Sequence, residues 1–365
     1  MSNATSRSAT IAKAVCVRVV LYGLALAGLG WWMFWAPGPA AVGSLKPLTA
    51  SDRAIASDLR RDIGILAGTI GERNLQFKPN QLEEAAAFID TSLRRAGYSV
   101  ASHWYRTSDG KARNLEAALP GSTNATDVVV VGAHYDSVPD SPGADDNASG
   151  VAVLLALARA LRKAHPPRSV RFVAFANEEA PYFWTDEMGS LVYARLCRKQ
   201  GDRVKAMLSI ESVGFYSDAP ASQRYPAGLG LVYPSRGDFV AFVGNLRSRS
   251  LMQQSLSQFR ASSALPSIGA SLPSAIPGVG WSDHWSFWQE GFPAIEITDT
   301  APYRNPYYHT ALDTPDRVDY GRLARLTEAL RRVVEGLANA GSSQISILNG
   351  TPWGLVALKE HQVRQ

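Results

Sequence analysis

The sequence predicts an α/β fold in which a mostly parallel central sheet carries helices on both faces, preceded by an N-terminal transmembrane helix. Two observations lead to this expectation. Uncharged runs rich in valine and phenylalanine, such as DVVVVGAH at 127–134, alternate with helical segments, which is typical of parallel sheets covered on both sides. Before them, residues 19–36 form an apolar stretch long enough to cross a bilayer.

The apolar stretch at 19–36 follows three basic residues, Arg7, Lys13 and Arg18. Positive charge on this side predicts a cytoplasmic N-terminus, a single-pass protein of the cell membrane, and a periplasmic or extracellular body. The small residues AVG at 41–43 favour the alternative of a cleaved signal peptide and a secreted protein.

The composition indicates one large globular body. Of the 365 residues, 46% are hydrophobic and 19% charged. The net charge of +5 comes from scattered residues without a dense basic block, so we expect no nucleic-acid binding. The only cysteines, Cys16 and Cys197, exclude a disulfide framework and a cysteine metal site. Nothing in the sequence indicates an oligomeric state.

We expect the chain to be organised in five segments. They are a cytoplasmic segment at 1–18, a membrane anchor at 19–36, a linker at 37–50, a folded domain at 51–340, and a tail at 341–365.

Local signals place the elements of the domain. A helix is expected at 51–70, and a second one is capped by Asn80, with Glu83 completing a capping box, and ends at Gly97. Strands are expected at 114–119, 127–134, 170–177, 206–214, 228–233 and 292–299, and further helices at 149–164 and from Tyr320 to about Ala340.

Acidic and imidazole side chains follow the ends of several of these strands. They are His134 with Asp136, Glu178 with Glu179, Glu211, and, after a short loop, His309; Asp145 and Asp146 precede the helix at 149–164. Because parallel strands bring their carboxyl ends to one edge of the sheet, we expect these groups to lie together. Massed carboxylates repel unless a cation neutralises them, and oxygen and imidazole ligands suit a zinc site. Two metals bridged by one carboxylate would use five ligands, for which the candidates are His134, Asp146, Glu179, Glu211 and His309.

The motifs GAHYDS, GADDNASG, NEE, MGS, SDHWSF and NPYYHTALDT occur in this order within residues 60–340. In this combination the chain resembles the M28 family of zinc aminopeptidases and related exopeptidases, so the folded domain at 51–340 is expected to be a zinc peptidase domain. The resemblance implies two zinc ions per chain, one held by His134 and Glu211, the other by Glu179 and His309, with Asp146 bridging. Many relatives carry Asp where Glu211 stands, which leaves the geometry of that zinc site open.

The resemblance also implies roles for the residues around the metals. Glu178 is the general base, and Tyr308 donates its hydroxyl to the developing oxyanion. Asp136 accepts a hydrogen bond from the His134 imidazole and so fixes its tautomer, and Asp283 lines the site. The peptide bond after Asp146 is expected to be cis, as in relatives.

The function expected from this resemblance is that of a dinuclear zinc exopeptidase, by default an aminopeptidase, acting on peptide or aminoacyl substrates. A glutaminyl cyclase with a single zinc and a member of the superfamily without catalytic activity are the alternatives. In PYFWTDE at 181–187, the aromatic residues either shape a substrate pocket or pack beneath a long loop. For His284, a structural role is favoured over metal binding.

Overall fold

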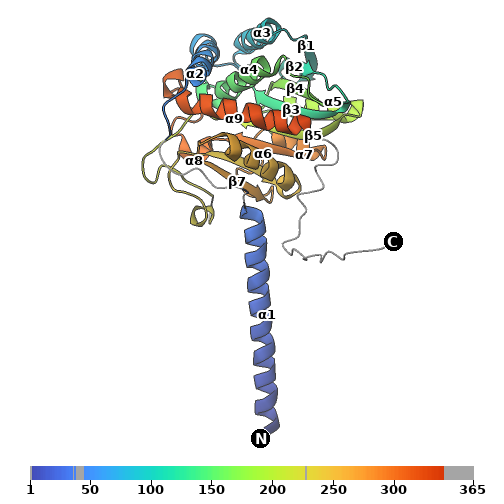
Figure 1. Cartoon of the computed structure of the whole chain (residues 1–365), viewed down its shortest axis with the longest axis vertical. Coiled ribbons are helices and arrows are strands. Elements are labelled where there is room, and N and C mark those ends of the chain that lie inside the picture. Colours follow the sequence, from blue (N-terminus) through green and yellow to red (C-terminus); the bar gives the residue numbers. More distant parts are fainter. Residues whose placement is uncertain (1, 36, 38–44, 227, 341–365) are drawn as a thin grey trace, which may run out of the picture.

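The computed structural model describes residues 2–35, 37, 45–226 and 228–340, and it places eight strands in one sheet (Figure 1). The strands are β1 (Val100–Thr107), β2 (Gly110–Leu119), β3 (Asn124–His134), β4 (Arg168–Phe175), β5 (Arg203–Glu211), β6 (Val240–Asn245), β7 (Ser267–Leu272) and β8 (Ala294–Thr298). Their order is β1-β2-β4-β3-β5-β8-β6-β7. The central strands β4, β3, β5 and β8 are parallel, whereas β1 and β2 form an antiparallel hairpin and β6 runs antiparallel to β8. The expected α/β fold is confirmed.

Helices cover both faces of the sheet. The α-helices of the described residues are α1 (Ser2–Phe34), which lies outside the domain, and α2 (Ala50–Ile63), α3 (Pro79–Arg95), α4 (Gly150–Leu161), α5 (Gly189–Gln200), α6 (Arg249–Ser262), α7 (His284–Gln289), α8 (Ala301–Arg304) and α9 (Tyr320–Asn339). Alternate valines of β3 face opposite cores, because successive strand residues point to opposite sides. Val129 and Val131 pack in the cluster built with α2, α3, α4, α6 and α9, and Val128 and Val130 pack in the cluster beneath α5 and α7.

Several local expectations are wrong. Lys78, not Asn80, precedes α3, and no side chain caps the helix. The helix begins at Pro79, whose fixed φ suits the first helical position, so Asn80 lies within the first turn. Glu83 instead contacts Arg113. The segment 228–233 is not a strand: Gly228 has φ of 86° and a short helical turn, Leu229–Leu231, follows. Strands β1, β6 and β7 were not among the expected elements.

The N-terminal helix α1 projects away from the body (Figure 1). Its span Val15–Met33 is 19 residues long, apolar, and unburied, which suits a membrane span or a signal sequence by length and composition. Its last turn touches the body, where Arg249 Nε donates to the Trp32 carbonyl at 2.9 Å and its guanidinium lies 4.5 Å from the centre of the Trp32 ring. Most of the expected linker, 38–44, and the tail 341–365 lie outside the described residues.

Candidate metal centre

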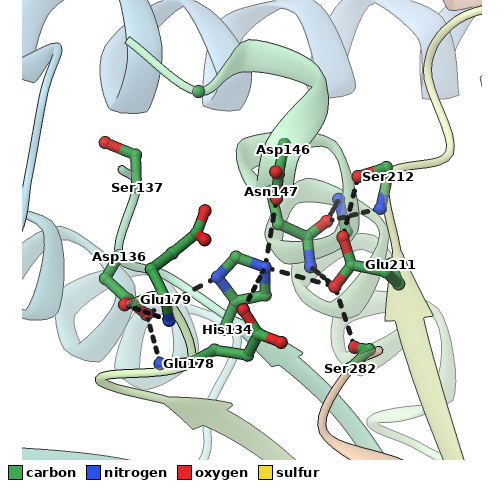
Figure 2. Close-up of polar contacts among 12 residues, drawn as sticks. His134, Asp136, Ser137, Asp146, Asn147, Glu178, Glu179, Glu211, Ser212 and Ser282 are labelled. Atoms are coloured by element: carbon green, nitrogen blue, oxygen red, sulfur yellow. Dashed lines mark hydrogen bonds and ion pairs between the residues drawn. The ribbon is translucent and has the colours of Figure 1, made fainter. Parts of the chain in front are cut away.

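The strand ends bring the acidic and imidazole groups together at one edge of the sheet (Figure 2). His134 is the last residue of β3 and Glu211 the last of β5, and the two strands are parallel neighbours. Glu178 and Glu179 follow β4, which pairs with β3 on its other side. The grouping therefore follows from three adjacent parallel strands that end at the same level.

Asp146 enters the centre from the segment between β3 and α4. The Asp146–Asn147 peptide bond is cis, which confirms the expectation. Asp313 holds this segment, because its carboxylate accepts hydrogen bonds from the backbone N–H groups of Asp145 at 2.9 Å and Asp146 at 3.1 Å.

The carboxylate of Asp146 lies between two imidazoles. Its Oδ1 is 3.2 Å from His134 Nε2, and its Oδ2 is 3.0 Å from His309 Nε2. Glu211 Oε2 lies 3.2 Å from the same His134 nitrogen, whereas Glu179 Oε2 lies 3.5 Å from the His309 nitrogen. The five residues thus form two groups that share Asp146, and the grouping is the one that the resemblance implies.

Buried ligand atoms in these groups have no hydrogen-bond partner among the described residues. Neither ring nitrogen of His134 makes a hydrogen bond, and neither does Glu179 Oε1. Ligand atoms of His134, Asp146 and Glu179 lie within 4.8 Å of one another. Buried polar atoms are normally paired, so unpaired nitrogen and oxygen atoms that converge on one point fit a metal ion.

The charges of the centre are unbalanced in favour of carboxylates. Burial raises the pKa of Glu178 and Glu179 well above the ordinary value, and neighbouring carboxylates raise both further. Burial alone would lower the pKa of His134, but Glu211 and Glu178 outweigh it and raise that pKa. Burial opposes ionisation of Asp146, yet the two imidazoles lower its pKa. A bound cation would relieve the repulsion among these carboxylates.

A single carboxylate orients the pair of glutamates. The backbone N–H of Glu178 donates to Asp136 Oδ1, and that of Glu179 donates to Asp136 Oδ2, both at 3.1 Å. Asp136 Oδ1 also lies 3.5 Å from His134 Nδ1. Glu178 Oε2 lies 3.9 Å from His134 Nε2, farther away than the oxygens of Asp146 and Glu211, which are both 3.2 Å from that nitrogen. Asp136 therefore holds the backbone of both glutamates and lies beside the His134 imidazole.

The remaining predicted residues lie at different distances from the centre. Tyr308 stacks on His309, with ring centroids 3.8 Å apart, and lines a cavity together with Glu211. Asp283 is buried within the electrostatic reach of His134, and burial raises its pKa to about 7. His284 is not in the cluster, because its Nε2 bonds the Val279 carbonyl at 2.8 Å.

Sequence reasoning assigned no role to three residues that hold the ligands in place. Besides Asp313, the hydroxyl groups of Ser212 and Ser282 donate to the two oxygens of Glu211, at 2.7 and 2.8 Å. Asp313 and Ser282 belong to the motifs NPYYHTALDT and SDHWSF, so their position in those motifs was the available signal.

The aromatic loop at 181–187 packs instead of shaping the cavity beside the centre. The Tyr182 hydroxyl bonds Asp109 at 2.5 Å, and Trp184 Nε1 bonds the Gly280 carbonyl at 3.0 Å. Phe183 stacks on Trp184, with ring centroids 4.9 Å apart. None of the three is among the residues that line that cavity, and Trp184 is 47% exposed.

Comparisons with known proteins agree with this arrangement. Residues 114–334 match the model of peptidase family M28. A protein of Escherichia coli strain K12, described as uncharacterized protein YfbL, is 37% identical over 281 residues, covering 74% of this chain and 85% of that protein. A probable leucine aminopeptidase of Arthroderma otae is 29% identical over 298 residues, covering 76% and 71%.

Two solved structures show the same fold. A zinc aminopeptidase from Bacillus subtilis has a TM-score of 0.63 at 16% identity, covering 80% of this chain and 97% of that one. A glutaminyl cyclase from Bacteroides thetaiotaomicron has a TM-score of 0.57 at 16% identity, covering 77% and 97%. Because the family match spans more than half of the chain and the Escherichia coli relative is similar over most of both proteins, the chain belongs to peptidase family M28.

Proposed function

We propose that this peptidase is a dinuclear zinc aminopeptidase in which Glu178 is the general base. The observation that carries the proposal is the position of Asp146, which presents one oxygen to the His134 imidazole and the other to the His309 imidazole. A carboxylate in this position serves two cations at once. The similarity to a probable leucine aminopeptidase supports the choice of aminopeptidase over other exopeptidases.

The ligand atoms fit zinc in number and kind. His134, Glu211 and one oxygen of Asp146 would hold one ion, and His309, Glu179 and the other oxygen would hold the second. Imidazole nitrogens and carboxylate oxygens without thiolates, in three-residue sets, are typical of catalytic zinc. Zinc bound here would act as a Lewis acid that makes water more acidic and a peptide carbonyl more electrophilic.

Glu178 moves the protons of the reaction. Its carboxylate takes a proton from the attacking water and passes it to the leaving amine. Burial and the neighbouring carboxylates Glu179 and Glu211 raise its pKa, which brings a glutamate closer to the range that suits a base at neutral pH. Asp136 fixes its backbone. Tyr308, beside His309, would donate its hydroxyl to the developing oxyanion.

The fold shared with a glutaminyl cyclase defines the rival function. A single-zinc cyclase has no need of a second ligand set, whereas Glu179 and His309 are both in place here. The full-length protein in detergent should contain two zinc ions per chain by elemental analysis, and should release free N-terminal amino acids from peptides. One zinc with pyroglutamate as the product would establish the cyclase. No zinc and no turnover would indicate a non-catalytic member.

We further propose that α1 anchors the protein in the membrane, with the domain at 51–340 outside the cytoplasm. Lys13 precedes the apolar span Val15–Met33, Arg18 lies in its first turn, and the span is unburied. The contact of Arg249 with Trp32 would place the body directly beside the non-cytoplasmic surface of the cell membrane.

A further inference from the structure

A cavity of about 90 Å³ opens beside the metal centre. At roughly 15 Å³ per water position, it holds on the order of six waters, which is comparable with one amino-acid side chain. Glu211, Ser212 and Tyr308 form the wall that it shares with the centre. A substrate whose terminal peptide bond lies at the centre would therefore place a neighbouring side chain in this cavity.

Most of the cavity wall is apolar or aromatic. Ala241 of β6 and Ala270 and Leu272 of β7 are buried at its base. Trp281 and Tyr303, whose rings stack with centroids 6.4 Å apart, also line it. Apolar walls suit the methylene groups of a long side chain, and aromatic faces attract cations.

Besides the proposed metal ligand Glu211, Glu296 is the charged residue among those that line the cavity. It lies in the middle of β8, is 5% exposed, and lines the cavity. Among the described residues none donates a hydrogen bond to its carboxylate, and the nearest basic atom, His284 Nε2, is 4.0 Å away. That nitrogen already bonds the Val279 carbonyl, and burial lowers the pKa of His284 to about 4, so the imidazole is neutral at neutral pH.

A buried carboxylate without a counter-charge is unfavourable. Burial, with a further contribution from Glu211, raises the pKa of Glu296 well above its ordinary value. An apolar residue would fill this position in β8 at lower cost, because isolated charges are poorly tolerated in apolar surroundings. A cationic group bound in the cavity would supply the missing charge and form a charge-assisted hydrogen bond.

We propose that this cavity receives the side chain of the N-terminal residue of the substrate and that Glu296 selects a basic residue there. The inference rests on the proposed aminopeptidase function. The register of the sheet supports the reach: Glu296 pairs with Ser209 in β5, and Glu211 follows two residues later on the same face. The Cα positions of Glu211 and Glu296 are thus offset along the strand direction by about 6.6 Å, a length comparable with the four-carbon stem of lysine.

Lysine and norleucine provide a matched pair of probes, because norleucine has the same four-carbon stem without the ammonium group. Hydrolysis of lysyl- and norleucyl-p-nitroanilide gives the ratio of their kcat/KM values. Calorimetric binding of free lysine and norleucine to the zinc-loaded full-length protein measures the same preference without turnover. Each measurement is made on the wild type, on Glu296→Met and Glu296→Gln, and on Glu84→Met, an exposed glutamate of α3, as the control.

The wild type and the Glu84 variant should prefer lysine in both measurements. Both Glu296 variants should lower the lysine-to-norleucine ratio by about 30-fold or more, since removing one partner of a buried charge pair typically has this effect. A ratio is independent of the amount of active protein, so partial misfolding of one variant does not affect it. The proposal would be overturned if the wild type hydrolysed or bound the norleucine probes as well as the lysine probes or better, or if the ratio were unchanged in both variants. Either result would leave the proposed aminopeptidase function unaffected. Selective, Glu296-dependent lysine binding without any turnover would instead refute the aminopeptidase and retain the cavity as a cation site.

Discussion

The adjacent glutamates at 178 and 179 should respond in opposite ways to the same substitution. Glu178→Gln keeps the size of the side chain and the backbone hydrogen bond to Asp136, but the amide cannot accept a proton. The five proposed metal ligands remain, so zinc content should stay at two per chain. Loss of a general base reduces kcat by about 10²–10⁴-fold, and a residue that serves as both base and acid should lie near the upper limit. At 10⁴-fold, the activation free energy rises by about 5 kcal/mol.

Glu179→Gln should instead weaken one metal site. Glu179 Oε2 lies 3.5 Å from His309 Nε2, in the group that is separate from His134. A neutral amide in place of this carboxylate should lower the zinc content from two towards one per chain. Excess zinc should restore part of the activity, which it cannot do for Glu178→Gln.

The assay combines elemental analysis with kcat on an aminoacyl anilide for both variants. Glu84→Gln makes the same chemical change on the exposed face of α3 and should leave both quantities unchanged. Loss of zinc in the Glu178 variant with full occupancy in the Glu179 variant would reverse the two roles. Substantial activity in both variants would mean that this pair is not part of the catalytic centre.

Three further predictions concern other parts of the molecule. Tyr308→Phe should lower kcat by about 10²–10³-fold with unchanged zinc content, and unaltered kcat would exclude an oxyanion contact by its hydroxyl. His284 has a pKa of about 4 in the folded protein, below its unfolded value, so its contribution to stability is present above pH 6.5 and is lost as the pH falls. By pH 4 this loss amounts to about 3 kcal/mol. Chemical denaturation should therefore show that the free energy of unfolding of the wild type falls relative to that of His284→Gln between pH 7 and 4. A difference that stays constant over this range would contradict the prediction. Protease added to intact spheroplasts should digest the domain at 51–340, and its protection there would refute the proposed membrane orientation.

Several features of the fold and the centre could be predicted because their signals are local. The valine run of β3 indicates a strand buried on both faces, and the charged residues that follow each central strand mark the functional edge. Strands β6 and β7 were not predicted, since they are short and acquire their pairing partners only in the assembled sheet. The segment 228–233 has strand-forming residues, but its leading glycine adopts a left-handed conformation and no neighbouring strand pairs with it.

The sequence by itself determined the α/β class, the apolar N-terminal helix and the residue types at the centre, because periodicity and strand-end composition are properties of neighbouring residues. Only the tertiary structure decided which oxygen of Asp146 faces which imidazole, and that Asp136 holds both glutamates. It alone also revealed the surroundings of Glu296, which in sequence is one polar residue within a strand. The position of β8 between β5 and β6 turns that residue into the charged wall of a cavity. Side-chain environments of this kind depend on contacts between segments distant in the chain, which no local pattern encodes.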